Sequence, residues 1–112
     1  MPKDFSELRQ HPRVNVDFFA DWGWGPECEY YDKITSLGVG GCFLATKREL
    51  SAGDEIYIRW TGESIGMISV KGAVRYQTRV MEGAPPTGAG IEFVATSAQN
   101  EQKLQTILSR YG

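Results

Sequence analysis

Cysteine and histidine are scarce in this chain of 112 residues: the cysteines are Cys28 and Cys42, and His11 is the one histidine. Two thiols cannot complete a four-ligand zinc site without distant carboxylates. His11 lies beside Pro12 in a polar, basic stretch that offers no third group to orient it for Cys–His catalysis. No motif places a carboxylate pair either, so we expect no enzyme, no metal site and no cofactor. We interpret both cysteines as small buried apolar residues.

Positive net charge and long apolar runs are also lacking. The formal net charge is −2 and the pI is about 5.4, whereas domains that bind nucleic-acid polymers are usually basic. No apolar run approaches the ~18 residues of a membrane span, and no leader of signal-peptide type is evident. We therefore expect one cytoplasmic globular domain over residues 1–112, without membrane insertion or nucleic-acid binding.

Apolar residues alternate with polar ones along most of the chain, which predicts β-strands. The expected strands lie near 14–18, 29–36, 41–46, 56–60, 68–76 and 89–93, with Val74 and Tyr76 on one face of the fifth and Trp60 in the core. Gly53-Asp54 and the segment 82–88 are expected loops. Six or seven short strands of this kind predict a mainly β fold, a closed antiparallel barrel over residues 14–94.

The last part of the chain has helical spacing instead. Its apolar residues recur at i, i+3, i+4 and i+7: Leu104, Ile107, Leu108 and Tyr111. Thr96 has capping-box spacing with Gln99, and Ser97 is an equally good N-cap. We expect an amphipathic helix over residues 97–110 that covers an open end or seam of the barrel.

Two arginines four residues apart, Arg9 and Arg13, precede the first strand, in a loop that Pro12 keeps from being helical. Each guanidinium offers a planar donor fork for a phosphate and a flat face for stacking on a purine. Arg75 and Arg79 have the same spacing. Because they would project from a strand about 13 Å apart, we interpret them as a solvated barrel face.

Three glycines, Gly38, Gly40 and Gly41, lie in a turn between the second and third strands. Glycine permits a positive φ and a close approach of a ligand to the main chain, although a tight turn alone would also explain it. The turn lacks the Lys-Ser/Thr ending of a P-loop. Trp22 and Trp24 follow the first strand in an expected loop, where they either form a partner-binding patch or plug the barrel.

The ordered combination of these features resembles the PilZ domain, a six-stranded barrel with a C-terminal helix that binds cyclic di-GMP in bacteria. The resemblance covers nearly the whole chain. It is carried by Arg9 and Arg13 in an R-x-x-x-R loop, Gly40-Gly41-Cys42-Phe43-Leu44, Ala52-Gly53-Asp54-Glu55-Ile56, Gly90-Ile91-Glu92-Phe93 and the closing helix. It implies a ligand loop over residues 1–13.

The resemblance also implies a ligand site of Arg9, Arg13, Ser36, Gly38 and Gly41. In the family, a [D/N]-x-S-x-x-G motif on the glycine turn holds a guanine edge and a phosphate. Here Gly41 matches the final glycine, but Ser36 stands in the Asp/Asn place and Gly38 in the Ser place. Gly38 retains only its backbone N–H, and the loss of two side-chain hydrogen bonds predicts affinity about tenfold to a hundredfold weaker.

The implied function is a cyclic di-GMP receptor, in which the nucleotide engages the arginine loop and changes a surface that binds an effector protein. The departures at Ser36 and Gly38, together with the Trp22 and Trp24 segment, suggest a different possibility. On that alternative, the domain is a ligand-independent adaptor that acts through protein–protein contacts in motility or envelope regulation.

Overall fold

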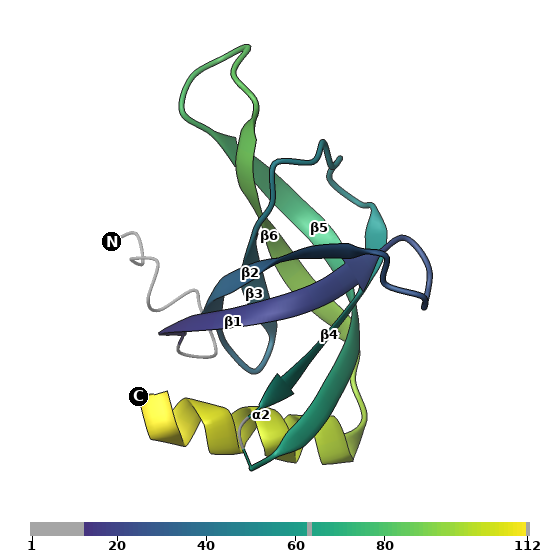
Figure 1. Cartoon of the computed structure of the whole chain (residues 1–112), viewed down its shortest axis with the longest axis vertical. Coiled ribbons are helices and arrows are strands. Elements are labelled where there is room, and N and C mark those ends of the chain that lie inside the picture. Colours follow the sequence, from purple (N-terminus) through teal and green to yellow (C-terminus); the bar gives the residue numbers. More distant parts are fainter. Residues whose placement is uncertain (1–12, 63, 112) are drawn as a thin grey trace, which may run out of the picture.

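The computed structural model describes residues 13–62 and 64–111 of the chain. The described elements, in chain order, are β1 (Val14–Gly23), β2 (Tyr30–Leu37), β3 (Gly41–Ala45), β4 (Glu55–Gly62), β5 (Gly66–Arg79), β6 (Pro86–Ala95) and the helix α2 (Ala98–Tyr111). The strands close into an antiparallel barrel in the order β1-β2-β3-β6-β5-β4, and α2 lies across one end of it (Figure 1). The predicted six-stranded barrel with one C-terminal helix is confirmed.

Alternation places one apolar face of each strand inside the barrel, because successive side chains of a strand point to opposite faces. The fully buried side chains of the core include Ile34, Leu37, Leu44, Ile56, Ile58, Ile68, Val74 and Ile91. Helix α2 closes this core at one end with Leu104 and Ile107, both buried. Burial of this kind contributes about 1.5–3 kcal/mol for each large aliphatic side chain.

The start of α2 is fixed by Ser97, whose Oγ accepts a hydrogen bond of 3.1 Å from the Asn100 backbone N–H. Ser97, not Thr96, is therefore the N-cap. Two side chains of the helix attach it to β5. Asn100 Nδ2 donates to the Ser69 carbonyl at 2.7 Å, and Lys103 Nζ donates to the Met67 carbonyl at 3.0 Å.

Two segments expected to be loops belong partly to strands. Strand β1 continues to Gly23 and therefore includes Trp22. This residue pairs with Tyr30 on one side and with Ile58 on the other. The β5–β6 hairpin extends to the Arg79–Pro86 pair, so β6 already begins within the expected loop 82–88. Proline is tolerated there because the first residue of a strand need not donate to the ladder.

Tyr76 is not in the core, contrary to the expectation from simple alternation. The register between β5 and β6 shifts between Val74 and Tyr76. An irregularity of this kind turns the following side chain to the other face. Val74 is accordingly buried, whereas Tyr76 is 47% exposed.

Candidate ligand-binding site

Arg13 and the glycine turn meet at one end of the β1–β2 strand pair. Val14, the first residue of β1, pairs with Leu37, the last residue of β2, so Arg13 and the turn that begins at Gly38 leave the barrel side by side. The Arg13 side chain reaches over this turn. Its Nη2 atom lies 3.1 Å from the position that a Cβ would occupy on Gly41. The structure thus brings Arg13, one of the two arginines that the sequence singled out, to the glycine turn.

Main-chain hydrogen bonds hold the glycine turn. The Gly38 N–H donates to the Gly41 carbonyl at 2.8 Å, and the Phe93 N–H of β6 donates to the Gly40 carbonyl at 2.9 Å. The backbone N–H of Gly38, expected to remain for a ligand, is therefore used by the turn itself.

Gly41 is required for a close approach of two strands. A Cβ on Gly41 would overlap the Ile91 carbonyl oxygen of β6, and the residue does not adopt a left-handed φ. Among the described glycines, positive φ values fall at Gly53, Gly66 and Gly83 instead. The absent side chain also leaves the space into which the Arg13 guanidinium extends.

Ser36 lies in a row of cross-strand neighbours on the outer face of the barrel. It pairs with Asn15 on β1 and with Phe43 on β3. Directly opposite residues of an antiparallel pair project to the same face, with Cβ atoms about 4.5–5.5 Å apart. The exposed amide of Asn15 therefore lies beside the Ser36 hydroxyl and two residues from Arg13. Sequence reasoning missed Asn15 because its importance depends on the register between β1 and β2.

Each arginine of the second pair, Arg75 and Arg79, forms an ion pair with a carboxylate. Arg75 Nη1 lies 3.0 Å from Glu92 Oε1, and Arg79 Nη2 contacts both carboxylate oxygens of Glu49 at 2.7 and 2.6 Å. Both arginines are at the surface, so their interpretation as a solvated barrel face is confirmed. This pair is a natural internal control for the N-terminal one.

Cys42 follows Gly41 and packs into the core beneath the turn. Burial raises the pKa of its thiol to about 12, while the nearby positive charge of Arg13 acts in the opposite direction. Cys28 is also buried, its thiol donates to the Tyr57 carbonyl at 3.7 Å, and burial raises its pKa. Both thiols are unbridged and protonated at neutral pH, as expected for small core residues.

The two tryptophans near the end of β1 have different roles. Trp22 is fully buried, and its Nε1 donates to Asp32 Oδ2 at 2.8 Å, so it fills one end of the barrel. Trp24 is 45% exposed and packs edge-on against Trp22, with ring centroids 6.2 Å apart. Of the two rings, only that of Trp24 is exposed enough to contact another protein.

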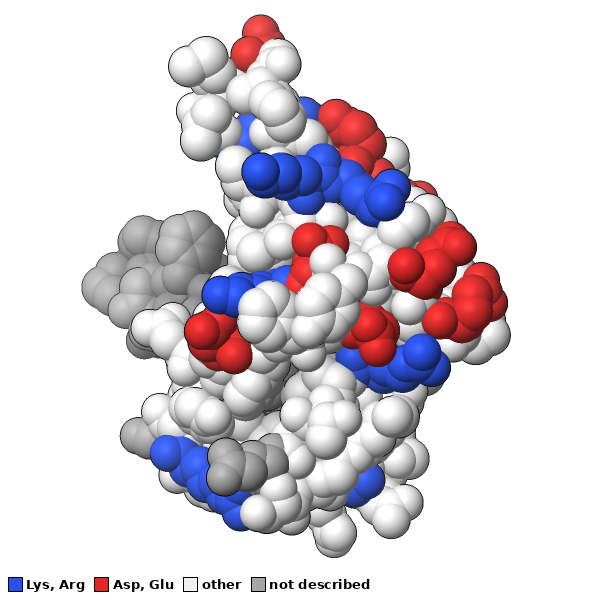
Figure 2. Space-filling view, in the orientation of Figure 1, with Lys and Arg blue, Asp and Glu red and all other residues white. Residues whose placement is uncertain are grey.

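Charges of both signs are interspersed over the face shown in Figure 2. Residues 13–62 and 64–111 contain no group of three or more His, Cys, Asp or Glu side chains that could hold a metal ion. No helix of the described chain is long and apolar enough to cross a membrane. Arg9 lies outside the described residues, so its predicted place in the site stays a prediction.

Comparison with known proteins identifies the fold. The family model described as PilZ domain matches residues 7–110, whereas no curated protein matches the sequence. The structure is similar to the inhibitor of motility MotI/DgrA of Bacillus subtilis, with a TM-score of 0.74 and 18% identity over 91% of this chain and 49% of that one. It is also similar to the PilZ domain of Escherichia coli YcgR with c-di-GMP, with a TM-score of 0.66 and 15% identity over 92% of this chain and 90% of that one.

A third similar structure is the K. pneumonia MrkH–c-di-GMP complex, with a TM-score of 0.68 and 20% identity over 90% of this chain and 51% of that one. The chain thus spans about half the length of MotI and MrkH, but almost all of the isolated YcgR domain. TM-scores of 0.66 to 0.74 establish a common fold.

Proposed function

Because this chain belongs to the PilZ domain family, we propose that it is a binding module for cyclic di-GMP that passes the signal to an effector protein. The observation that carries the proposal is the Arg13 guanidinium over Gly41, beside the glycine turn. YcgR and MrkH were both solved with c-di-GMP, and the same ligand is proposed here. The proposed role is binding, without catalysis.

Arg13 supplies the charge for the phosphate of the ligand. A guanidinium donates two parallel hydrogen bonds to a phosphate, and hydrogen bonds between charged groups are roughly twice as strong as neutral ones. The small residue at Gly41 keeps the space beside the guanidinium open. Arg9, four residues earlier, is proposed to contact the same nucleotide.

Asn15 and Ser36 supply the polar groups that a guanine requires. The Watson–Crick edge of guanine carries two donor groups, so its partner must present an acceptor oxygen. We propose that the Asn15 amide oxygen accepts from this edge. Its register opposite Ser36 places it next to the position at which the family motif has Asp or Asn. In this way, an amide on β1 substitutes for one on β2.

The glycine turn is expected to contribute less to ligand binding than the two arginines do. Ser36 offers one short hydroxyl, and Gly38 offers neither a side chain nor an available N–H. The affinity is therefore expected to depend strongly on Arg9 and Arg13.

Thermal unfolding with added nucleotide tests the proposed ligand. A ligand that binds only the native state raises the unfolding midpoint, by an amount that grows with its concentration. We expect cyclic di-GMP to raise the midpoint and cyclic di-AMP, which lacks the guanine edge, to raise it less. An unchanged midpoint at millimolar cyclic di-GMP would contradict the proposal and favour the ligand-independent adaptor.

A further inference from the structure

The loop that joins β1 to β2, residues 24–29, carries an exposed aromatic side chain that the proposed nucleotide site does not use. Trp24 is 45% exposed, and the edge-on contact with the buried Trp22 holds one side of its ring. Tryptophan is among the residues that contribute most to binding at protein interfaces. Arg13 precedes β1 and this loop follows it, so the two lie at opposite ends of the strand (Figure 1).

Cys28 anchors this loop to the barrel. Its backbone N–H donates to the Gly25 carbonyl at 3.2 Å, and its buried thiol donates to the Tyr57 carbonyl of β4 at 3.7 Å. The residue adopts a φ of +47°, a conformation that is unfavourable for a residue with a side chain and persists only where the surroundings fix it. Trp24 is therefore presented on a loop of fixed geometry, which reduces the entropy lost when a partner binds.

Two glycines bring acidic residues next to Trp24. The Glu27 carboxylate folds back over Gly25, where its Oε1 and Oε2 atoms lie 2.5 and 2.9 Å from the position of a Cβ. The Glu29 nitrogen lies 3.1 Å from the corresponding position on Gly23. Because Gly23 and Gly25 are the chain neighbours of Trp24, an exposed glutamate flanks the indole on each side.

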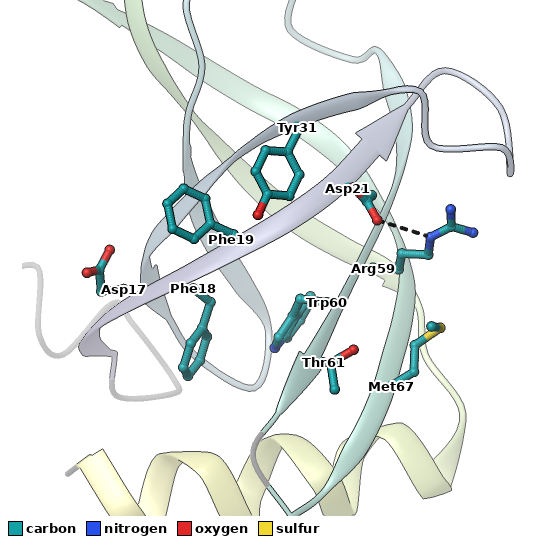
Figure 3. Close-up of a pocket in the computed structure, with 9 residues that line it drawn as sticks. All are labelled: Asp17, Phe18, Phe19, Asp21, Tyr31, Arg59, Trp60, Thr61 and Met67. Atoms are coloured by element: carbon teal, nitrogen blue, oxygen red, sulfur yellow. Dashed lines mark ion pairs between the residues drawn. The ribbon is translucent and has the colours of Figure 1, made fainter.

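The negative charge of these two glutamates is not matched by ion pairs. Arg59, at the base of the loop, pairs with Asp21 at 3.7 Å, as Figure 3 shows, and reaches only the main-chain carbonyl of Glu27, at 3.4 Å. Neither Glu27 nor Glu29 forms an ion pair with any lysine or arginine of residues 13–62 and 64–111. Figure 2 shows acidic side chains over the side of the molecule from which this loop projects in Figure 1. The loop is thus complementary to a cation.

The combination of an indole and a carboxylate selects arginine among the cations. A guanidinium stacks on an aromatic face and donates two parallel hydrogen bonds to a carboxylate, whereas the ammonium of lysine acts as a point charge. The adjoining Tyr30 already binds such a group, because the Arg48 guanidinium lies 3.6 Å from the centroid of its ring. No cation of the described chain lies over Trp24 in the same way.

We propose that this loop binds an arginine of the effector protein, with the guanidinium stacked on Trp24 and hydrogen-bonded to the Glu27 carboxylate. Glu29 attracts further basic residues beside that arginine. The proposal rests on the proposed function only in taking the effector to be the occupant. Because Arg13 lies at the other end of β1, the nucleotide and the effector occupy separate surfaces and bind the same molecule together.

The test uses a phage-displayed library of random 12-residue peptides, selected on the whole chain without nucleotide. We expect the enriched peptides to share an arginine, and their affinity to fall at least tenfold when citrulline, its uncharged isostere, replaces that arginine. Glu27→Gln should weaken binding of the arginine peptide by about as much, and Trp24→Leu, which keeps an apolar side chain but removes the indole, at least threefold. Glu82→Gln is the matched control, because Glu82 is an exposed glutamate of the β5–β6 hairpin, and it should bind within twofold of the unaltered chain.

Glu27→Gln keeps the shape of an exposed side chain, so it tests the site even if Trp24→Leu disturbs the loop. Failure to enrich any peptide would overturn the proposal, and so would enriched peptides without arginine or peptides that bind Glu27→Gln as tightly as the unaltered chain. A self-association in sedimentation that Trp24→Leu abolishes would also overturn it, because the occupant would then be a second copy of this chain. The selection contains no cyclic di-GMP, so its failure is distinct from a failure of the chain to bind the nucleotide.

Discussion

The Arg13 guanidinium lies over Gly41, with Nη2 3.1 Å from the place of a glycine Cβ. This contact joins the residue before β1 to the residue that opens β3. It positions a cationic donor fork above a turn whose backbone is held by hydrogen bonds to its own end and to β6. The proposed ligand site depends on this contact between a long cationic side chain and a glycine, which has no side chain.

Gly41→Ala is expected to disturb both the fold and the ligand site. The added methyl group would overlap the Ile91 carbonyl oxygen and press on Arg13, and overpacking of this kind costs about 1–3 kcal/mol. Gly53→Ala is the control, because its Cβ would meet nothing within 4 Å and only its φ of +94° is strained. Urea unfolding measures the stability of each variant, and titration with cyclic di-GMP measures its affinity. Equal affinities of both variants would contradict the role of Gly41.

Asn15→Ala is expected to weaken cyclic di-GMP binding by about fivefold, equivalent to one neutral hydrogen bond of about 1 kcal/mol. Ser36→Asn in the same chain should restore the affinity, since residues 15 and 36 are cross-strand neighbours. Titration calorimetry on the single and double variants measures this rescue. If Asn15→Ala binds as the unaltered chain does, Asn15 has no part in the site.

Much of the barrel was predictable because alternation is a local property of the chain. Ile56, Ile58 and Trp60 alternate with polar residues and are all buried, as expected. Tyr76 was placed wrongly because its face depends on a register shift against β6, which no local pattern specifies.

The candidate site was predictable only in part, for a similar reason. Arg13 and Gly41 can be picked out from the sequence as candidate ligand residues. Their contact, however, depends on how β1, β2 and β3 align. Asn15 has no distinguishing local signal and becomes relevant only once it is known to face Ser36. The short pairing of β1 with β4, over three residues, could not be predicted, because it depends on the alignment of strands that are distant in the sequence.

Trp22→Phe is expected to destabilise the fold by about 2 kcal/mol more than Trp60→Phe does. Both side chains are buried, but only Trp22 donates a hydrogen bond to a carboxylate, Asp32, and such bonds contribute about 1.5–3 kcal/mol. Chemical denaturation of the two variants gives the comparison. A larger loss for Trp60→Phe would show that its Nε1 has an acceptor in solution.

Cys42 is expected to make stability fall at high pH. In the unfolded chain its thiol ionises near the ordinary pKa of 9.0, whereas burial keeps it protonated in the fold up to about 12. Between these values the unfolded state binds fewer protons, so the free energy of unfolding decreases as pH rises, by up to about 1.4 kcal/mol per unit.

Urea unfolding of the unaltered chain and of Cys42→Ala at pH 8, 9 and 10 measures this contribution. The variant is expected to be less stable at pH 8 because it leaves a cavity, but to lose less stability as pH rises. Parallel curves for the two proteins would contradict the assignment to Cys42.

Titration calorimetry with cyclic di-GMP on two matched arginine double variants tests the central claim most directly. Arg9→Ala/Arg13→Ala removes two cations from the proposed site, and Arg75→Ala/Arg79→Ala removes two with the same spacing from surface ion pairs. Loss of two charge-assisted hydrogen bonds predicts affinity at least about a hundredfold weaker for the first variant. The second should bind within about twofold of the unaltered chain. Equal affinities of the two variants, or no heat with the unaltered chain at millimolar nucleotide, would contradict the account.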